Sequence, residues 1–125
     1  MVVDSAATET VVSDEMLKTI DAKEGMASRR GVEYEVANGV RIPNLGEKKF
    51  LGVSTEGMTR TITAQVCDVT KPLLSVKKVM AAGNRVVFDI DGSYIEDKQT
   101  QERMWLKEEN GMFLLRMWAK RPEVF

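Results

Sequence analysis

The sequence predicts an all-β domain with one short helix. Residues 32–36 and 59–66 alternate apolar and polar side chains, which is the pattern of strands with one buried face. Asn-Gly and Asp-Gly pairs mark turns between such strands. Residues 73–80 instead place apolar side chains at helical spacing. Together these features indicate about eight short strands in a barrel-like arrangement.

The composition restricts the possible functions. The 125 residues suit a single domain, and 18 basic residues balance 19 acidic ones. This balance provides no electrostatic surface for direct binding to nucleic acid or to a membrane. No apolar run is long enough to span a bilayer, and no signal peptide is recognisable. We therefore expect an intracellular protein.

The available side chains also limit the chemistry. The chain has no histidine, which excludes a Ser-His-Asp triad, a Cys-His pair and a zinc site with histidine ligands. Catalysis, if present, must depend on carboxylates, lysine, tyrosine or hydroxyl groups. The one cysteine, Cys67, lies in an apolar run, and we predict a core residue in a reducing compartment. We expect no metal and no cofactor.

The first half of the chain contains one clear hairpin. Ser13 is predicted to cap a short helical turn, because two acidic residues follow it. Residues 25–31 are predicted to form a loop. Residues 32–42 are predicted to form a hairpin with its tip at 37–39, because Asn38-Gly39 is a strong type I′ turn signal. Pro43 restricts the second strand to a sheet edge or a bulge.

The middle of the chain is predicted to contain a strand pair followed by the helix. Residues 48–53 and 59–69 are expected to pair across a turn at 54–57. The helix is expected to begin near Leu74 and to end at Gly83, a natural C-terminal cap.

Two further hairpins are predicted near the C-terminus. Their turns are Asp91-Gly92 and Asn110-Gly111, and Met117-Trp118 is expected to continue the second arm of the later hairpin. The charged tail, residues 119–125, is expected to fray.

Asp4 is the most unusual residue of the N-terminal segment. It follows Val2-Val3 directly, although burying a carboxylate is costly unless the group is paired or hydrogen-bonded. Small residues follow, which let the backbone turn sharply and approach another group closely. One interpretation is a general-base carboxylate. The alternative is a strand that simply ends at a turn, because Asp and Ser favour turns through local hydrogen bonds.

Several motifs occur together in a specific order. They are Asp4-Ser5-Ala6-Ala7-Thr8, the hairpin at 32–42, Leu73-Leu74-Ser75-Val76, and the stretches 83–88 and 91–98. In this order they resemble the retropepsin-like aspartic proteases encoded by copia-type retrotransposons, whose Asp motif reads Asp-Ser/Thr-Gly-Ala-Ser/Thr. The resemblance extends from residue 2 to about residue 118. The Asp motif is short, so its spacing to the later blocks provides most of the specificity.

The resemblance implies a fold and an assembly. The fold would be a retropepsin-like acid protease barrel with a flap hairpin and one short helix. Residues 1–82 would form the protease core, residues 83–118 would continue the same domain as β-hairpins, and residues 119–125 would be a tail. The active form would be a homodimer that cleaves a peptide or a retroelement polyprotein, in the cytoplasm or in a retroelement particle.

The resemblance also implies site residues. Asp4 would be catalytic, with one copy from each subunit, and Ser5 and Ala6 would brace the two active-site loops. The substrate would contact Ala7, Thr8 and Glu9 on the loop and Ala37, Asn38 and Gly39 on the flap.

Two departures from the family pattern bear on activity. The family's glycine after Asp-Ser is Ala6 here, and that glycine makes room for the partner's loop. The family also has one or more strands ahead of the Asp motif, whereas only three residues precede Asp4 here. The chain would then be a fragment of a longer polyprotein or a degenerate copy. We expect it to be largely monomeric at micromolar concentration and weakly active or inactive.

Two other functions remain open. One is a catalytically inactive retropepsin-like remnant, and the other is a β-barrel interaction module with edge strands for a partner. Individual residues have simpler interpretations too. Thr8 and Glu9 fit a solvated turn, and Trp105 and Trp118, like the eight methionines, fit a core or an interface. The acidic residues around Asp91 fit a solvated hairpin face better than a Ca²⁺ site, because the EF-hand spacing is absent.

Overall fold

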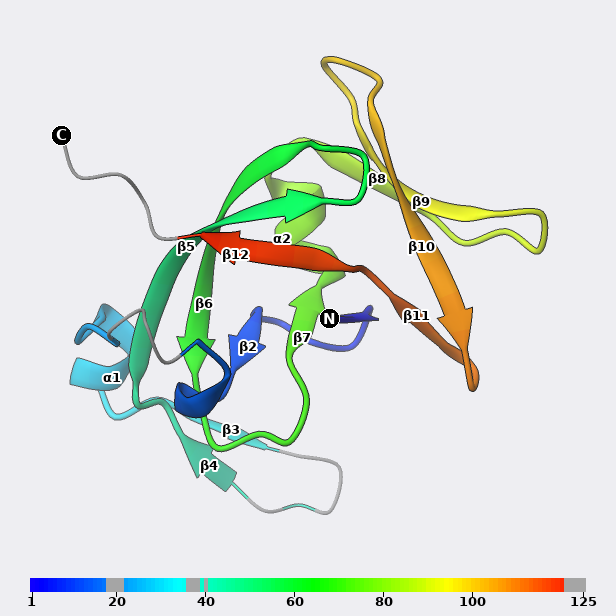
Figure 1. The fold of residues 1–125 in the computed structure, drawn as a ribbon. Helices are drawn as coiled ribbons and strands as arrows, with labels where there is room; N and C mark the ends of the chain where they lie inside the picture. Colours follow the sequence, from blue (N-terminus) through cyan, green and yellow to red (C-terminus); the bar gives the residue numbers. More distant parts are fainter. Residues whose placement is uncertain (18–21, 36–38, 40, 121–125) are drawn as a thin grey trace, which may run out of the picture.

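The protein is built mostly of β-strands. The computed structural model describes residues 1–17, 22–35, 39 and 41–120 (Figure 1). The strands are β1 (Val2–Asp4), β2 (Val11–Val12), β3 (Glu33–Glu35), β4 (Arg41–Pro43), β5 (Gly46–Ser54), β6 (Thr59–Val66), β7 (Leu73–Ser75), β8 (Asn84–Val87), β9 (Ser93–Asp97), β10 (Arg103–Glu109), β11 (Met112–Leu114) and β12 (Met117–Lys120). The α-helices are α1 (Met26–Arg29), with four residues, and α2 (Val76–Ala81), with six. The predicted all-β class is therefore confirmed.

Ten of these strands form one hydrogen-bonded sheet. Its order is β12-β5-β6-β2-β7-β1-β11-β10-β9-β8, so β1 lies between a parallel neighbour, β7, and an antiparallel neighbour, β11. Within the described residues the pairings end at β12 on one side and at β8 on the other. The closed barrel that we expected is therefore not found, although the strands curve around a common interior (Figure 1).

The β5–β6 hairpin is the longest pairing in the sheet. It runs in register from Gly46 opposite Val66 to Val53 opposite Thr59, as the alternation of residues 59–66 predicts. Its inner face buries Phe50 and Ala64. These residues belong to one of two apolar clusters, made of Val12, Phe50, Ala64 and Val66. The second cluster consists of Val3, Met58, Leu74, Val76, Ile95, Met104 and Leu115.

Buried residues confirm part of the predicted core. Met58 and Met104 are buried, and so is Cys67, whose burial raises the thiol pKa to about 11. Trp105 and Trp118 are instead 49% and 52% exposed. A core role for the two tryptophans is therefore wrong, and their role in an interface stays a prediction.

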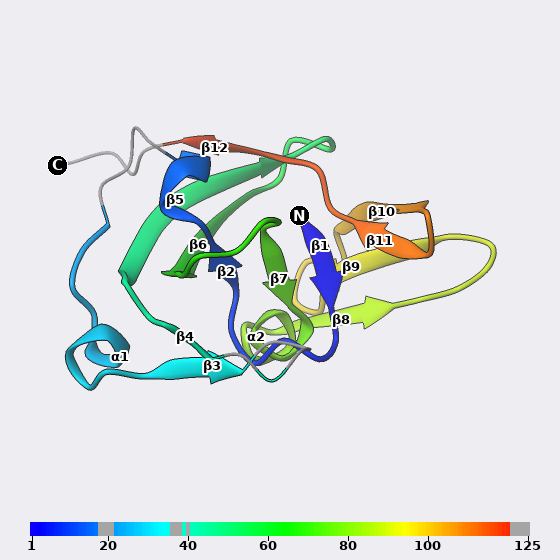
Figure 2. The same ribbon diagram turned by 90° about the horizontal axis from the view of Figure 1, so that it is seen from below.

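The predicted hairpin at 32–42 is confirmed. Strands β3 and β4 pair antiparallel as a separate two-stranded sheet, with Tyr34 opposite Ile42. Pro43 lies opposite Glu33 at the end of this small sheet, where its missing N–H is tolerated. At the tip, Gly39 has φ +81°, as a type I′ turn requires, whereas Ala37 and Asn38 lie outside the described residues. Figure 2 shows this hairpin and α1 at one end of the molecule and β8–β11 at the other.

Two predicted boundaries are wrong near the helices. Leu73–Ser75 is a strand, because it pairs in parallel with β1, and α2 begins only at Val76. The end at Gly83 is confirmed, with φ +92°. The segment predicted as a loop at 25–31 contains the short helix α1. There the Ser28 hydroxyl accepts from the Gly25 N–H at 2.9 Å, which stabilises the first turn.

The C-terminal hairpins are confirmed, but the final strand has another partner. Asn110 and Gly111, with φ values of 51° and 76°, make the turn between β10 and β11. Met117 and Trp118 do not continue the arm that pairs with β10. They open β12, which pairs with β5 and extends through Lys120, two residues into the segment predicted as a tail.

The predicted turn after Ser13 is a 3₁₀ helix, η1 (Asp14–Leu17). Lys48 of β5, which is only 1% exposed, makes hydrogen bonds to this helix. Its Nζ donates to the carbonyl oxygens of Asp14 and Leu17, at 2.7 and 3.0 Å, and lies 3.2 Å from the Asp14 carboxylate. No helix among the described residues is long and apolar enough to cross a bilayer.

Candidate active site

Asp4 ends β1 and begins a tight turn. It is half-buried, and it lies opposite Ser75 in the parallel pairing with β7. Its Oδ1 accepts a hydrogen bond from the backbone N–H of Ala6 at 2.8 Å. This local hydrogen bond is typical of the turns that Asp favours, and it orients the carboxylate at the end of β1. This geometry is therefore compatible with both interpretations of Asp4, as a turn residue and as a positioned carboxylate.

Ser75 holds the loop that follows Asp4, which we call the Asp4 loop (residues 5–10). The Ser75 side chain is completely buried, and its hydroxyl donates to the Ala7 carbonyl oxygen at 2.7 Å. The Ser75 backbone N–H donates to the buried hydroxyl of Thr10 at 3.1 Å. The Ser75 Oγ also accepts from the Lys78 N–H at 3.2 Å, so it caps α2. One residue thus joins the loop, β7 and the helix.

The predicted site residues on the Asp4 loop differ in exposure. Ser5, Ala6 and Thr8 are exposed, whereas Ala7 is half-buried. Glu9 is also half-buried, and its carboxylate lies 3.4 Å from Lys78 Nζ of α2. Among these five residues, Ala7 and Glu9 are the ones that the structure ties to β7 and α2, through Ser75 and Lys78.

The base of the β3–β4 hairpin contains a polar cluster that the sequence analysis missed. Asn44, directly after β4, donates through Nδ2 to Tyr34 Oη at 3.1 Å and to Gln65 Oε1 at 2.8 Å. Burial raises the pKa of Tyr34 above its usual value, the Asn44 hydrogen bond lowers it, and the charges of Cys67 and Glu9 add smaller increases.

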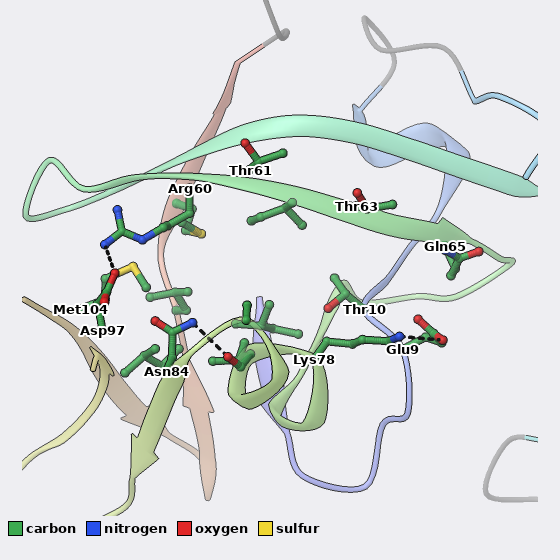
Figure 3. A pocket seen from close by; sticks show the side chains of 17 residues that line it. Glu9, Thr10, Arg60, Thr61, Thr63, Gln65, Lys78, Asn84, Asp97 and Met104 are labelled. Carbon is green, nitrogen blue, oxygen red and sulfur yellow. Dashed lines mark hydrogen bonds and ion pairs between the residues drawn. The ribbon is translucent and has the colours of Figure 1, made fainter. Parts of the chain in front are cut away.

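A groove of about 440 Å³ lies between β6 and α2 (Figure 3). The ion pair Glu9–Lys78 lies at one end and the ion pair Arg60–Asp97 at the other. The apolar side chains that line it are Ile62, Leu74, Val79, Ala82, Ile95, Met104, Leu115 and Met117. Polar lining comes from Thr10, Thr61, Thr63, Gln65 and Asn84. These residues lie far apart in the sequence, so no motif marks the groove.

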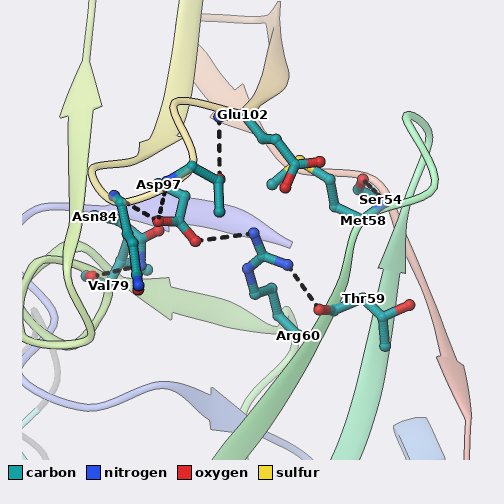
Figure 4. Close-up of polar contacts among 10 residues, drawn as sticks. Ser54, Met58, Thr59, Arg60, Val79, Asn84, Asp97 and Glu102 are labelled. Atoms are coloured by element: carbon teal, nitrogen blue, oxygen red, sulfur yellow. Dashed lines mark hydrogen bonds and ion pairs between the residues drawn. The ribbon is translucent and has the colours of Figure 1, made fainter.

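The Arg60–Asp97 pair closes one end of this groove (Figure 4). Arg60 Nη2 lies 3.0 Å from Asp97 Oδ2, and Arg60 Nη1 donates to the Thr59 carbonyl. Backbone hydrogen bonds from Gln99 and Thr100, followed by Arg60, hold the pKa of Asp97 below its usual value. Among the described residues, no group of three His, Cys, Asp or Glu side chains is placed to hold a metal ion.

No family model, no curated protein and no solved structure matches this chain. The case for a function therefore depends on the sequence motifs and on the geometry of the Asp4 loop.

Replacing Ser75 should loosen the Asp4 loop specifically. Ser75→Ala removes a helix cap and leaves the half-buried Ala7 carbonyl without its donor, so the free energy of unfolding should fall by about 2 kcal/mol. Hydrogen–deuterium exchange should rise in residues 5–10. Ser54→Ala is a matched control, because Ser54 is 2% exposed and its Oγ accepts from Met58 N–H in a distant turn. Equal exchange rates in the loop of both variants would contradict this role of Ser75.

Proposed function

We propose that this chain is an aspartic endopeptidase of the retropepsin-like type, active as a homodimer on a peptide or retroelement polyprotein. The observation that carries the proposal is the placement of Asp4. Its carboxylate ends a strand that is flanked on both sides, and its loop is anchored by Ser75, a residue of the second matching motif. Two motifs that lie about 70 residues apart in the sequence, and that carry the resemblance, thus meet in one hydrogen-bonded unit.

The chemistry requires a second carboxylate, which a second copy of the chain would supply. In a two-fold interface a residue next to the symmetry axis faces its own copy, so two Asp4 side chains would face each other in a dimer whose axis passes between the two Asp4 loops. Two carboxylates about 3 Å apart cannot both ionise, and the pair would share one proton. One member would activate a water molecule and the other would protonate the substrate carbonyl or the leaving amine. The pair would titrate as a unit.

The remaining residues would bind substrate. An extended peptide would pair by strand addition with the Asp4 loop, through Ala7, Thr8 and Glu9. The β3–β4 hairpin, with Ala37, Asn38 and Gly39 at its tip, would close over the peptide and exclude water. Ser5 and Ala6 are exposed next to Asp4, where they would brace the loop of the partner.

Ala6 would affect the contact between two subunits and not the fold of one subunit. Ala6 is exposed and is not among the described residues with positive φ, so the loop itself does not require glycine there. The extra methyl group matters only where two Asp4 loops would meet. Overpacking such a contact costs roughly 1–3 kcal/mol. The unmodified chain would accordingly dimerise weakly, which makes the inactive remnant the main competing interpretation.

If the chain or its Ala6→Gly variant cleaves peptides at about pH 5, Asp4→Asn should abolish that cleavage, because the shared proton needs two carboxyl groups. The circular dichroism spectrum should not change, since an amide can still accept from the Ala6 N–H. Asp68→Asn serves as the control, because Asp68 is exposed and far along the chain from the Asp4 loop. Undiminished turnover in purified Asp4→Asn would exclude Asp4 as the catalytic residue.

Ala6→Gly should strengthen the dimer and raise the specific activity. Sedimentation velocity across a concentration series should show the dissociation constant falling by roughly 5- to 150-fold, as expected for relief of 1–3 kcal/mol at the contact. The control is Ala119→Gly, which makes the same chemical change at an exposed residue of β12. A stable, active dimer of the unmodified chain would show that the methyl group causes no obstruction.

A further inference from the structure

We infer that Asn44 is a positioning residue that links the β3–β4 hairpin to the Asp4 loop. Asn44 follows β4 directly and is only 6% exposed. The consequence for cleavage rests on the proposed function. The link itself is a property of the fold that can be measured without any activity.

Asn44 makes two hydrogen bonds to the hairpin. Its backbone N–H donates to the Val32 carbonyl at 2.8 Å, just ahead of β3. Its Nδ2 donates to Tyr34 Oη at 3.1 Å, in the middle of β3. A two-stranded hairpin has little stability of its own, and this one is not part of the ten-stranded sheet. Hydrogen bonds at its base therefore contribute strongly to its position.

A continuous series of hydrogen bonds leads from Asn44 to the Asp4 loop. Asn44 Nδ2 donates to Gln65 Oε1 at 2.8 Å, and the Gln65 backbone N–H donates to the Thr10 carbonyl at 2.8 Å. The Thr10 hydroxyl accepts from Ser75, which holds the loop through Ala7. Asn44, Gln65, Thr10 and Ser75 thus connect the base of the hairpin to the segment that carries Asp4.

Two contacts determine the orientation of the Asn44 amide. Its Oδ1 accepts from the Gly46 N–H at 2.8 Å, and Gln65 Oε1 needs an N–H donor, whereas Tyr34 Oη can accept or donate. Gly46 is itself held in place, because it pairs with Val66 of β6. Neither an aspartate nor an alanine can reproduce this set of bonds.

Hydrogen–deuterium exchange tests the link directly. Asn44→Ala should raise exchange on the order of 5- to 30-fold both in the hairpin and at the Gln65 and Ser75 amides, as expected for the loss of buried hydrogen bonds. Tyr34→Phe removes only the contact with β3 and should raise exchange in the hairpin alone. Tyr94→Phe makes the same change in β9 and should raise exchange in neither region.

Two exchange results would overturn the inference. One is an increase in Asn44→Ala that is confined to the hairpin, because Asn44 would then not reach the Asp4 loop. The other is an equal increase throughout, including β9 and β10, because Asn44 would then contribute only to general stability.

Peptide cleavage separates this inference from the proposed function. In an active protein, Asn44→Ala should raise KM several-fold with a smaller change in kcat, because the hairpin binds the substrate. A purely structural role would lower the active fraction and therefore kcat at constant KM, which would contradict the inference. If neither the unmodified chain nor Ala6→Gly cleaves while the exchange coupling is present, the proposed function fails and the link stands.

Discussion

The Ser75 hydroxyl makes the hydrogen bonds on which the rest of the candidate site depends. β1 has only three residues, so it cannot by itself determine the course of the chain beyond Asp4. Ser75 holds this part of the chain in place. Its hydroxyl donates to the Ala7 carbonyl and accepts from the Lys78 N–H of α2, and Ser75 itself lies in β7, beside β1. Ser75 itself is completely buried, and a buried polar atom without a partner costs about 1–3 kcal/mol. The Asp4 loop is thus held by the same residue that starts the helix.

Other features of the fold shape the groove and hold the β3–β4 hairpin. The larger apolar cluster contributes Leu74, Ile95, Met104 and Leu115 to the lining of the groove between β6 and α2, and ion pairs lie at its two ends. Exposed ion pairs usually contribute little, but Arg60 and Asp97 are about one-third exposed or less and are supported by backbone hydrogen bonds. β12 pairs antiparallel with β5 and is the last strand on that side of the sheet among the described residues. The hairpin that would cover a substrate is attached through Asn44.

Much of the fold can be predicted from local pattern. The hairpin at 32–42, the pairing of 48–53 with 59–69 and the hairpin around Asn110-Gly111 are predicted from alternation and turn residues, which are local signals, and the structure contains all three with ends that differ by a few residues. The strand at Leu73-Leu74 is not predicted, because its apolar spacing suits a helix equally well and only pairing with β1 makes it a strand. Asp4 is a candidate because of its motif, and its catalytic role stays a prediction. Asn44, Lys48 and the groove are not predicted, because their partners lie 10 to 34 residues away or more and no local pattern records them.

The proposal that two copies of Asp4 form one catalytic site is tested most directly by inhibitor stoichiometry. A pepstatin-type inhibitor should be titrated into Ala6→Gly by calorimetry at about pH 5, where a carboxyl pair holds one proton. The account predicts one inhibitor per two chains, with dimer formed on binding. It also predicts no binding to the double variant that adds Asp4→Asn. Binding of one inhibitor per chain, or binding that survives Asp4→Asn, would contradict it.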